Sequence, residues 1–315
     1  MEYDDFIALI ERSIKENWDA SALTDYEGAT LQYKDVARKI EKLHILFENA
    51  GIYPGDRIAL YGRNTSQWAV AFLAVMTYGA VAVPILHEFK GEQAHNIVNH
   101  SEARLLFVGD QVWPRLNPDE MPGLEGIINN PDYSLLVSRS ERLTEARENL
   151  NALYGQRYPK FFRKEHVSYH PQPDGEALAI INYTSGTTGF SKGVLTPLNA
   201  LAGNVKFCLQ EGVIRPDSRQ LVFLPLAHAF GCAFDFLSTF CAGAHAWLVG
   251  KTPSPRILLE AFQVVKPTCI FTVPLILEKL YKKFILPMVG TRTADELREF
   301  MLQALGGCVE QVIVG

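Results

Sequence analysis

The segment from Tyr183 to Val194 has the residue types of a polyphosphate-binding loop. Its sequence, YTSGTTGFSKGV, contains five Ser or Thr hydroxyls, three glycines and one lysine, and it follows an apolar strand predicted over residues 177–182. Glycines let the backbone turn and bring N–H groups close to an anion, and the hydroxyls add hydrogen-bond donors. Lys192 supplies a positive charge, and hydrogen bonds to a charged partner contribute about 1.5–3 kcal/mol each. We therefore predict that this segment holds phosphate groups.

The spacing of the glycines separates this segment from two common nucleotide-binding motifs. Gly189 follows Gly186 by three residues and Lys192 precedes a glycine, which excludes the G-x-x-x-x-G-K-[ST] loop. The G-x-G-x-x-G pattern is absent as well.

His228, in the segment LPLAHAFG, is a second candidate for chemistry. An imidazole can donate a hydrogen bond to a carboxylate or a carbonyl, although a lone histidine among apolar residues is more often part of a core. The aromatic residues that follow it have two interpretations, because they can line an apolar pocket or pack in the core. They are Phe230, Phe234, Phe236 and Phe240.

Helical segments alternate with short apolar strands along much of the chain, which predicts parallel strands covered by helices. The expected fold class is α/β, with two lobes of mostly parallel sheets. The turn-rich segment at residues 170–175 marks the expected boundary, giving an N-terminal lobe at 1–172 and an incomplete phosphate-loop lobe at 173–315. Residues 111–169 have a weaker pattern and are expected to form an irregular surface with a charged helix at 141–154.

Residues 68–86 are uncharged, but the break at Gly79 favours a helix followed by a core strand that ends at Pro84 over a membrane-spanning helix. Residues 312–314 are expected to form a buried strand that lacks a covering helix, so we expect the chain to be a truncated N-terminal portion without its C-terminal domain.

The composition of the chain bears on its partners, its cysteines and its location. The 315 residues include 30 Lys+Arg and 35 Asp+Glu without a dense basic tract, which argues against nucleic acid as a partner. The five cysteines form no C-x-x-C pair, so we expect reduced, structural thiols. The N-terminus lacks the basic and apolar regions of a secretory signal, and a cytoplasmic location is expected.

The segment Tyr183–Val194 resembles, almost letter for letter, the phosphate-binding motif of the adenylate-forming superfamily of acyl-CoA synthetases, peptide-synthetase adenylation domains and luciferases. The segment at 224–231 is similar to the aromatic motif of that family. Further resemblance to acyl-CoA synthetases extends over nearly the whole chain, at residues 31–33, 54–59, 78–84, 99–102, 273–274 and 278–279.

The resemblance implies ATP, Mg²⁺ and CoA as cofactor and co-substrates, and a medium- or long-chain fatty acid as the acid that is activated. It implies catalytic roles for Lys192 and for His228, which would lie beside the acyl carboxylate. Thr187 would also bind Mg²⁺. The partners would be these small molecules, and peripheral contact with a membrane is left open. The open edge of the strand at residues 312–314 favours a homodimer by pairing with a second chain. The residues implied to contact the ATP phosphates are Thr184, Ser185, Gly186, Thr187, Thr188, Gly189 and Lys192.

Parts of the family pattern are missing. The chain contains no Tyr-Gly-x-Thr-Glu motif, no Thr-Gly-Asp motif and no C-terminal domain with an adenylation lysine, so we expect it to be catalytically incomplete alone. Asp235 is similar to the amino-group ligand of peptide synthetases, but it lies too close in sequence to Gly243. We expect it to be a helix residue near the protein surface or to cap a turn. The alternatives are a non-catalytic ATP- or acyl-binding fragment, an interaction module, and activation of an aryl or amino acid.

Overall fold

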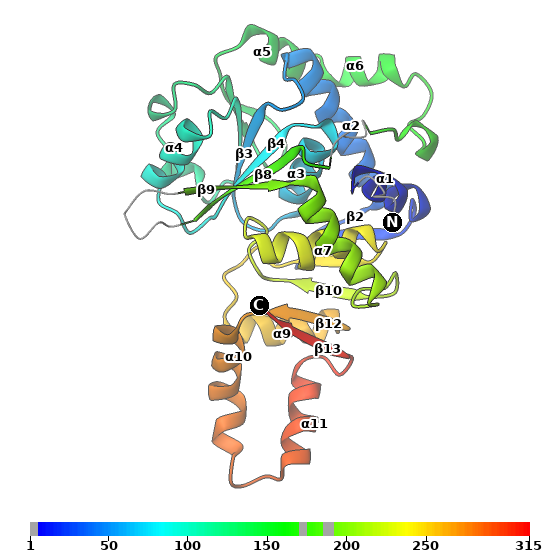
Figure 1. Ribbon diagram of the computed structural model, residues 1–315, viewed down its shortest axis with the longest axis vertical. Coiled ribbons are helices and arrows are strands. Elements are labelled where there is room, and N and C mark those ends of the chain that lie inside the picture. Colours follow the sequence, from blue (N-terminus) through cyan, green and yellow to red (C-terminus); the bar gives the residue numbers. More distant parts are fainter. Residues whose placement is uncertain (1–5, 170–174, 185–191) are drawn as a thin grey trace.

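The computed structural model describes residues 6–169, 175–184 and 192–315, which form two mixed, mostly parallel sheets (Figure 1). This confirms the expected α/β class. One sheet has the order β7 (Leu135–Ser138), β6 (Gly126–Asn129), β5 (Leu105–Val108), β3 (Arg57–Tyr61), β4 (Val81–Ile85), β8 (Leu178–Thr184), β9 (Lys192–Pro197). The other has the order β13 (Gln311–Val314), β12 (Cys269–Thr272), β10 (Arg219–Val222), β11 (His245–Leu248), β1 (Ser21–Asp25), β2 (Thr30–Gln32).

The two sheets exchange strands across residue 172. β1 and β2 precede that position and extend the six-stranded sheet, whereas β8 and β9 follow it and complete the seven-stranded sheet. β1 lies parallel to β11, with Leu23 opposite Ala246, and β8 lies parallel to β4, with Ile180 opposite Ala82. The sheets therefore do not divide at residue 172, and separable lobes on either side of it stay a prediction.

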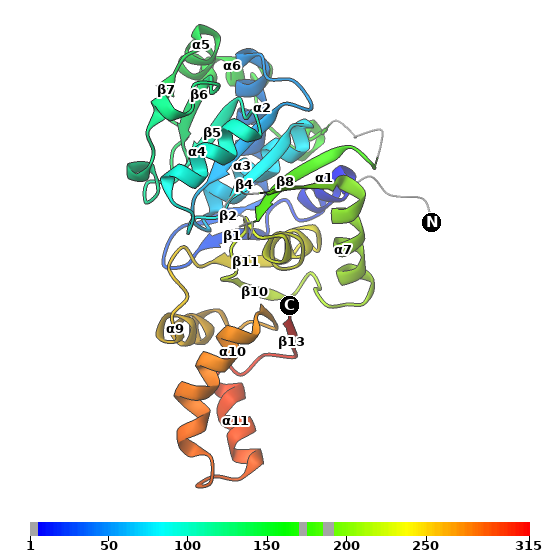
Figure 2. The same ribbon diagram turned by 60° about the vertical axis from the view of Figure 1, so that its left-hand side comes forward.

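Helices surround both sheets (Figures 1 and 2). The α-helices are α1 (Phe6–Glu16), α2 (Tyr33–Ala50), α3 (Ser66–Tyr78), α4 (Gly91–His100), α5 (Glu141–Glu148), α6 (Leu150–Arg157), α7 (Leu198–Gln210), α8 (Ser238–Cys241), α9 (Pro255–Val265), α10 (Pro274–Leu280) and α11 (Ala294–Ala304). Shorter 3₁₀ turns are η1 (Trp113–Arg115), η2 (Pro118–Glu120), η3 (Lys164–His166) and η6 (Leu286–Met288), and η4 (Gly231–Leu237) and η5 (Tyr281–Ile285) are π-helical. In Figure 1, α10 and α11 extend away from the sheets at the lower end of the molecule.

The buried helix α3 joins the two sheets. Thr65 caps its first turn by accepting a hydrogen bond from the Trp68 amide at 3.1 Å, and it ends at Gly79, whose φ of 84° suits a glycine. Nearly every side chain between these ends is buried, because α3 packs against β3 and β4 on one side and meets Phe236 of η4 through Phe72 on the other. The uncharged stretch is thus a helix and a strand, as predicted, and β4 continues through Pro84 to Ile85.

The strand expected at residues 312–314 is present as β13 and pairs in parallel with β12 at the edge of its sheet. Val312 and Val314 are 43% and 48% exposed, as expected for an apolar strand without a covering helix. β9 was not foreseen, and neither were β6 and β7 within the segment expected to be irregular. None of the helices in the described ranges combines the length and apolar character needed to cross a membrane.

Candidate active site

The predicted phosphate segment starts at the end of β8 and finishes within β9. β8 ends at Thr184, and β9 begins at Lys192, which is the antiparallel partner of Thr184. Both side chains are exposed at the open end of this hairpin. The other predicted phosphate contacts lie outside the described residues; they are Ser185, Gly186, Thr187, Thr188 and Gly189.

His228 lies in the loop that follows β10 and lines a cavity. Its side chain is exposed, and its Nδ1 accepts a hydrogen bond from the Phe230 amide at 3.3 Å. Its backbone amide donates to the Pro225 carbonyl at 3.0 Å, which makes a tight turn at this position. The core interpretation of His228 therefore does not hold, because an exposed imidazole beside a cavity is available to a ligand.

Two asparagines from the seven-stranded sheet hold the His228 loop. Asn64, just after β3, donates to the Leu224 carbonyl at 2.8 Å and accepts from the Leu226 amide at 3.0 Å. Asn182, within β8, donates to the Ala227 carbonyl at 3.1 Å. The strand that leads into the phosphate segment thus also contacts the residue before His228. Neither asparagine was identified from the sequence, because their partners are backbone atoms 160, 162 and 45 positions away.

A cavity of about 460 Å³ lies beside His228, between the carboxyl ends of strands from both sheets. A ligand site at the carboxyl ends of parallel strands is the usual arrangement in α/β folds. The residues that follow β3, β4, β10, β11 and β12 all contribute to its wall. Apolar side chains form much of the lining, namely Leu86, Phe223, Leu224, Phe230, Val249, Val273, Leu275 and Ile276.

Cationic side chains outnumber carboxylates at this cavity. Arg63, Lys251 and Lys279 line it together with one acidic residue, Glu88. Lys251 forms an ion pair with Glu27, and Arg63 donates to the Gly250 carbonyl at 3.4 Å. No ion pair within the described ranges involves Arg63 or Lys279. This charge distribution suits an anionic ligand that also has an apolar part.

His87 is the second histidine of the cavity wall. Burial lowers its pKa below the ordinary value of 6.5, and Arg63 and Arg115 lower it further, although Glu88 at 3.3 Å acts in the opposite direction. A neutral imidazole at physiological pH follows, which can both donate and accept a hydrogen bond.

The phenylalanines after His228 have different positions. Phe230 lines the cavity, and its ring centroid lies 6.0 Å from that of Phe271 in β12. Phe234 packs between Phe230 and Phe271, at 5.3 and 6.3 Å. Phe236 and Phe240 are fully buried in the core. The pocket interpretation therefore holds for Phe230, and the core interpretation holds for Phe236 and Phe240.

Asp235 is not near the surface, so that expectation was wrong. It is fully buried in η4, and its Oδ1 accepts a hydrogen bond from Gln220 at 2.8 Å. Burial raises its pKa well above the ordinary value, and the Gln220 contact only partly offsets this. Asp235 does not line the cavity, so this carboxyl group is not placed to receive the amino group of an amino acid substrate.

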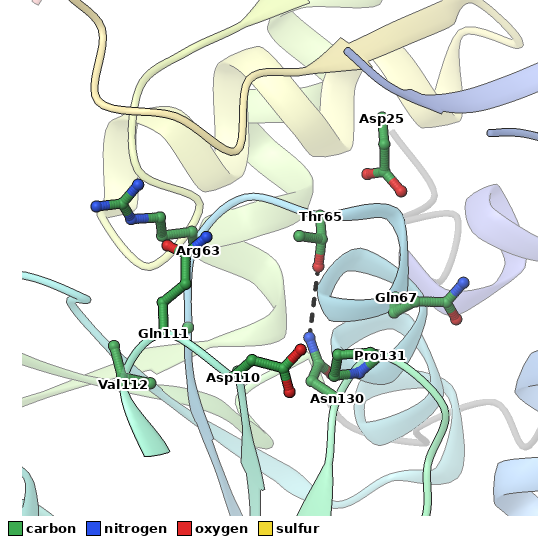
Figure 3. Close-up of a pocket in the computed structure, with 11 residues that line it drawn as sticks. Asp25, Arg63, Thr65, Gln67, Asp110, Gln111, Val112, Asn130 and Pro131 are labelled. Atoms are coloured by element: carbon green, nitrogen blue, oxygen red, sulfur yellow. Dashed lines mark hydrogen bonds between the residues drawn. The ribbon is translucent and has the colours of Figure 1, made fainter. Parts of the chain in front are cut away.

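A second, more polar cavity of about 300 Å³, which Arg63 also lines, lies where β3, β5 and β6 end (Figure 3). Asp25 of β1 accepts hydrogen bonds from the amide and the hydroxyl of Ser66 at 2.6 and 2.7 Å, which connects the six-stranded sheet to the start of α3. Asn130 donates to Thr65 at 3.5 Å, as the dashed line in Figure 3 shows. These contacts give the cavity wall a structural role at the junction of the sheets.

Among the described residues, no group of three or more His, Cys, Asp or Glu side chains could hold a metal ion. The cysteines in this part of the chain are all free thiols, as expected. A magnesium ion that accompanies ATP takes most of its ligands from phosphate oxygens and water.

The sequence model of the family described as "AMP-binding enzyme" matches residues 10–315. The chain belongs to this family. AMP-binding enzymes are adenylate-forming, acyl-activating enzymes of the acid–CoA ligase superfamily, and ATP binding is typical of them, which agrees with the expected phosphate site.

Individual comparisons agree with this family. Long chain acyl-CoA synthetase 3 of Arabidopsis thaliana is 27% identical over 79% of this chain and 37% of its own length. A red-emitting luciferase from Phrixothrix hirtus has the same fold, with a TM-score of 0.77 and 17% identity over 99% of this chain and 56% of the luciferase. ATP-bound MatB from Rhodopseudomonas palustris superposes with a TM-score of 0.70 and 19% identity, over 98% of this chain and 55% of MatB. The chain spans less than half the length of the curated relatives it matches.

Proposed function

We propose that the whole protein activates a medium- or long-chain fatty acid with ATP and transfers the acyl group to CoA. The observation that supports this most directly is that Asn182 connects the strand before the phosphate segment to the loop that carries His228. Asn182 belongs to the strand that enters the phosphate segment, and it binds the backbone next to His228 at the mouth of an apolar cavity. Phosphate and acyl carboxylate would therefore meet at one edge of the molecule.

The chemistry has two steps. A carboxylate oxygen of the acid attacks the α-phosphorus of ATP, the new O–P bond forms, and the bond to the departing pyrophosphate breaks. Lys192 and the hydroxyls beside it would neutralise the charge that grows on the pyrophosphate. His228 would donate a hydrogen bond to the acyl oxygen. In the second step the CoA thiol gives up its proton to water, its sulfur attacks the acyl carbon, and AMP departs with the electrons of the C–O bond.

Two features favour a fatty acid over an amino acid. The cavity wall is largely apolar, with Phe230 and Val273 among its residues, and its volume of about 460 Å³ lies within the range of small-molecule sites. Asp235, the candidate partner for an amino group, is buried elsewhere. The similarity to a long chain acyl-CoA synthetase supports the same choice.

The decisive test is acid-dependent ATP–pyrophosphate exchange by the whole protein, measured with fatty acids of increasing length, benzoate and a set of amino acids. We expect exchange with the fatty acids. Exchange with benzoate or an amino acid alone would overturn the choice of substrate, and absence of exchange with ATP binding intact would favour the non-catalytic binder. Absence of both exchange and ATP binding would favour an interaction module.

The phosphate assignment has its own control. Lys192→Ala is expected to lose exchange, whereas Lys160→Ala, which removes an exposed charge far along the chain from the segment, is expected to retain it. Equal exchange in the two variants would contradict the assignment of Lys192.

A further inference from the structure

A groove of about 520 Å³ lies between α2, α5, α6 and the turn after β6. It shares no lining residue with the cavity at His228. Four cationic side chains line it, and two carboxylates accompany them. Arg38, Lys39 and Lys42 come from α2, Arg147 comes from α5, and the carboxylates are Asp35 and Asp132.

The three cationic side chains on α2 repel one another. Lys39 and Lys42 are three residues apart, and Arg38 and Lys42 are four apart, so each pair lies on neighbouring turns of one helix. Like charges at these spacings destabilise a helix. An anion bound in the groove would reduce this repulsion between the cationic side chains.

The two carboxylates are already engaged. Asp35 accepts from the Gln32 amide at 3.0 Å and pairs with Arg38 at 3.2 Å. Asp132 accepts from the amide and the hydroxyl of Ser134 at 3.0 and 2.7 Å, and these bonds lower its pKa. Both carboxylates therefore stabilise the local backbone, and Arg38 is the groove cation that has a carboxylate partner within hydrogen-bond distance.

The remaining cations have neutral partners. Lys42 donates to the Asn151 side chain at 2.9 Å, and Arg147 donates to the Tyr133 carbonyl at 2.5 Å. The Lys39 ammonium lies 5.9 Å from the ring centroid of Tyr133, and among the described residues it has no ion pair. Burial and the nearby Lys42 lower the pKa of Lys39, more than Asp35 raises it. A half-buried ammonium without an anionic partner is costly, and a bound anion removes that cost.

We propose that this groove binds a phosphate group through Lys39, Lys42 and Arg147, at a site separate from the phosphate segment at 184–192. Phosphate oxygens accept several charge-assisted hydrogen bonds at once, which matches three donors from two helices. The group belongs to a small phosphorylated metabolite or to a phospholipid headgroup, because the recognition chemistry is the same for both.

The test is calorimetric titration of the chain with inorganic phosphate at low ionic strength, in a Lys192→Gln background that suppresses binding at the phosphate segment. We expect saturable binding that weakens by about 10-fold or more in Lys39→Gln/Lys42→Gln, because each lost charged hydrogen bond corresponds to roughly that factor. Lys34→Gln is the matched control, since Lys34 lies on the same helix outside the groove and pairs with Asp19 at 2.8 Å. It should leave binding unchanged.

Two further measurements keep the result interpretable. In protein whose lysines carry ¹³C-methyl groups, the Lys39 resonance should shift as phosphate is added, and circular dichroism should show that the double variant is folded. Co-sedimentation with phosphatidylcholine vesicles, with and without phosphatidic acid, separates the sources, because binding that requires phosphatidic acid and the two lysines identifies a headgroup. Absence of saturable binding up to about 10 mM phosphate, or equal binding in the double variant, would overturn the proposal.

Discussion

Replacing Asn64 by alanine should destabilise the junction between the two sheets and move the His228 loop. The side chain is 7% exposed, and it makes two hydrogen bonds to backbone atoms of that loop. Alanine leaves the Leu224 carbonyl and the Leu226 amide without these partners. Each buried polar group left unpaired costs about 1–3 kcal/mol, and water that enters the vacated space recovers part of this, so we expect a loss of about 2–4 kcal/mol.

The assay is urea denaturation followed by tryptophan fluorescence, with Asn99→Ala as the matched control. Asn99 also donates to a backbone carbonyl, that of Glu120 at 2.7 Å, but it is exposed and water replaces the bond. The control should lose less than about 1 kcal/mol. An Asn64→Ala variant no less stable than Asn99→Ala would refute the argument that burial of these two bonds holds the loop.

Four further outcomes are expected. Lys192→Ala in the whole protein should raise the barrier of adenylation by at least about 2 kcal/mol, measured by pyrophosphate exchange, because it removes the positive charge of the segment. His228→Ala should lower activity and leave the thermal unfolding midpoint unchanged, since its side chain is exposed; a large drop in the midpoint would return this residue to the core. The 315-residue chain alone should form no acyl-CoA from ATP, a long-chain fatty acid and CoA, and robust thioester would contradict the expectation that it is incomplete. Burial lowers the pKa of His245 from 6.5 to about 4, so the unfolded state binds protons first and the free energy of unfolding should fall as pH drops from 6.5 towards 4. Partial exposure reduces the effect to about 1–2 kcal/mol, and an equal pH dependence in His245→Gln would contradict it.

Local sequence patterns were sufficient to predict the helices and strands whose ends are marked by glycine or proline. Gly79 separates α3 from β4 in a stretch without charges, and the left-handed backbone at this glycine is the physical reason for the break. The strand before the phosphate segment was likewise predicted from its apolar run. β9 was missed because it includes glycine and proline and exposes Val194 and Leu195, 50% and 65% accessible, at the edge of a sheet.

Contacts between residues far apart in the chain could not be predicted from local sequence patterns. Asp235 lies in a π-helical segment that packs against β10. Its apolar neighbours Phe234 and Phe236 are compatible with burial, but a carboxyl group ordinarily favours the surface, and only the fold supplies Gln220 as its partner. Asn64 and Asn182 resemble ordinary polar residues near strand ends until the second sheet supplies their partners. The roles of the phosphate segment and of His228 stay predictions, and the asparagines that connect these two parts of the chain could not be found from the sequence.

Because each sheet contains strands from distant parts of the chain, some strands are synthesised long before the strands with which they pair. β1 is complete at residue 25, but its parallel partner β11 begins only at residue 245. At about 5–20 residues per second, a ribosome needs roughly 10–45 seconds to make the intervening chain. β3, β4 and β5 can pair long before that, whereas β1 and β2 emerge as a hairpin whose parallel edge has no partner. An unpaired edge that persists for this time is open to association with other nascent chains, so chaperone contact during translation should concentrate on the first thirty or so residues.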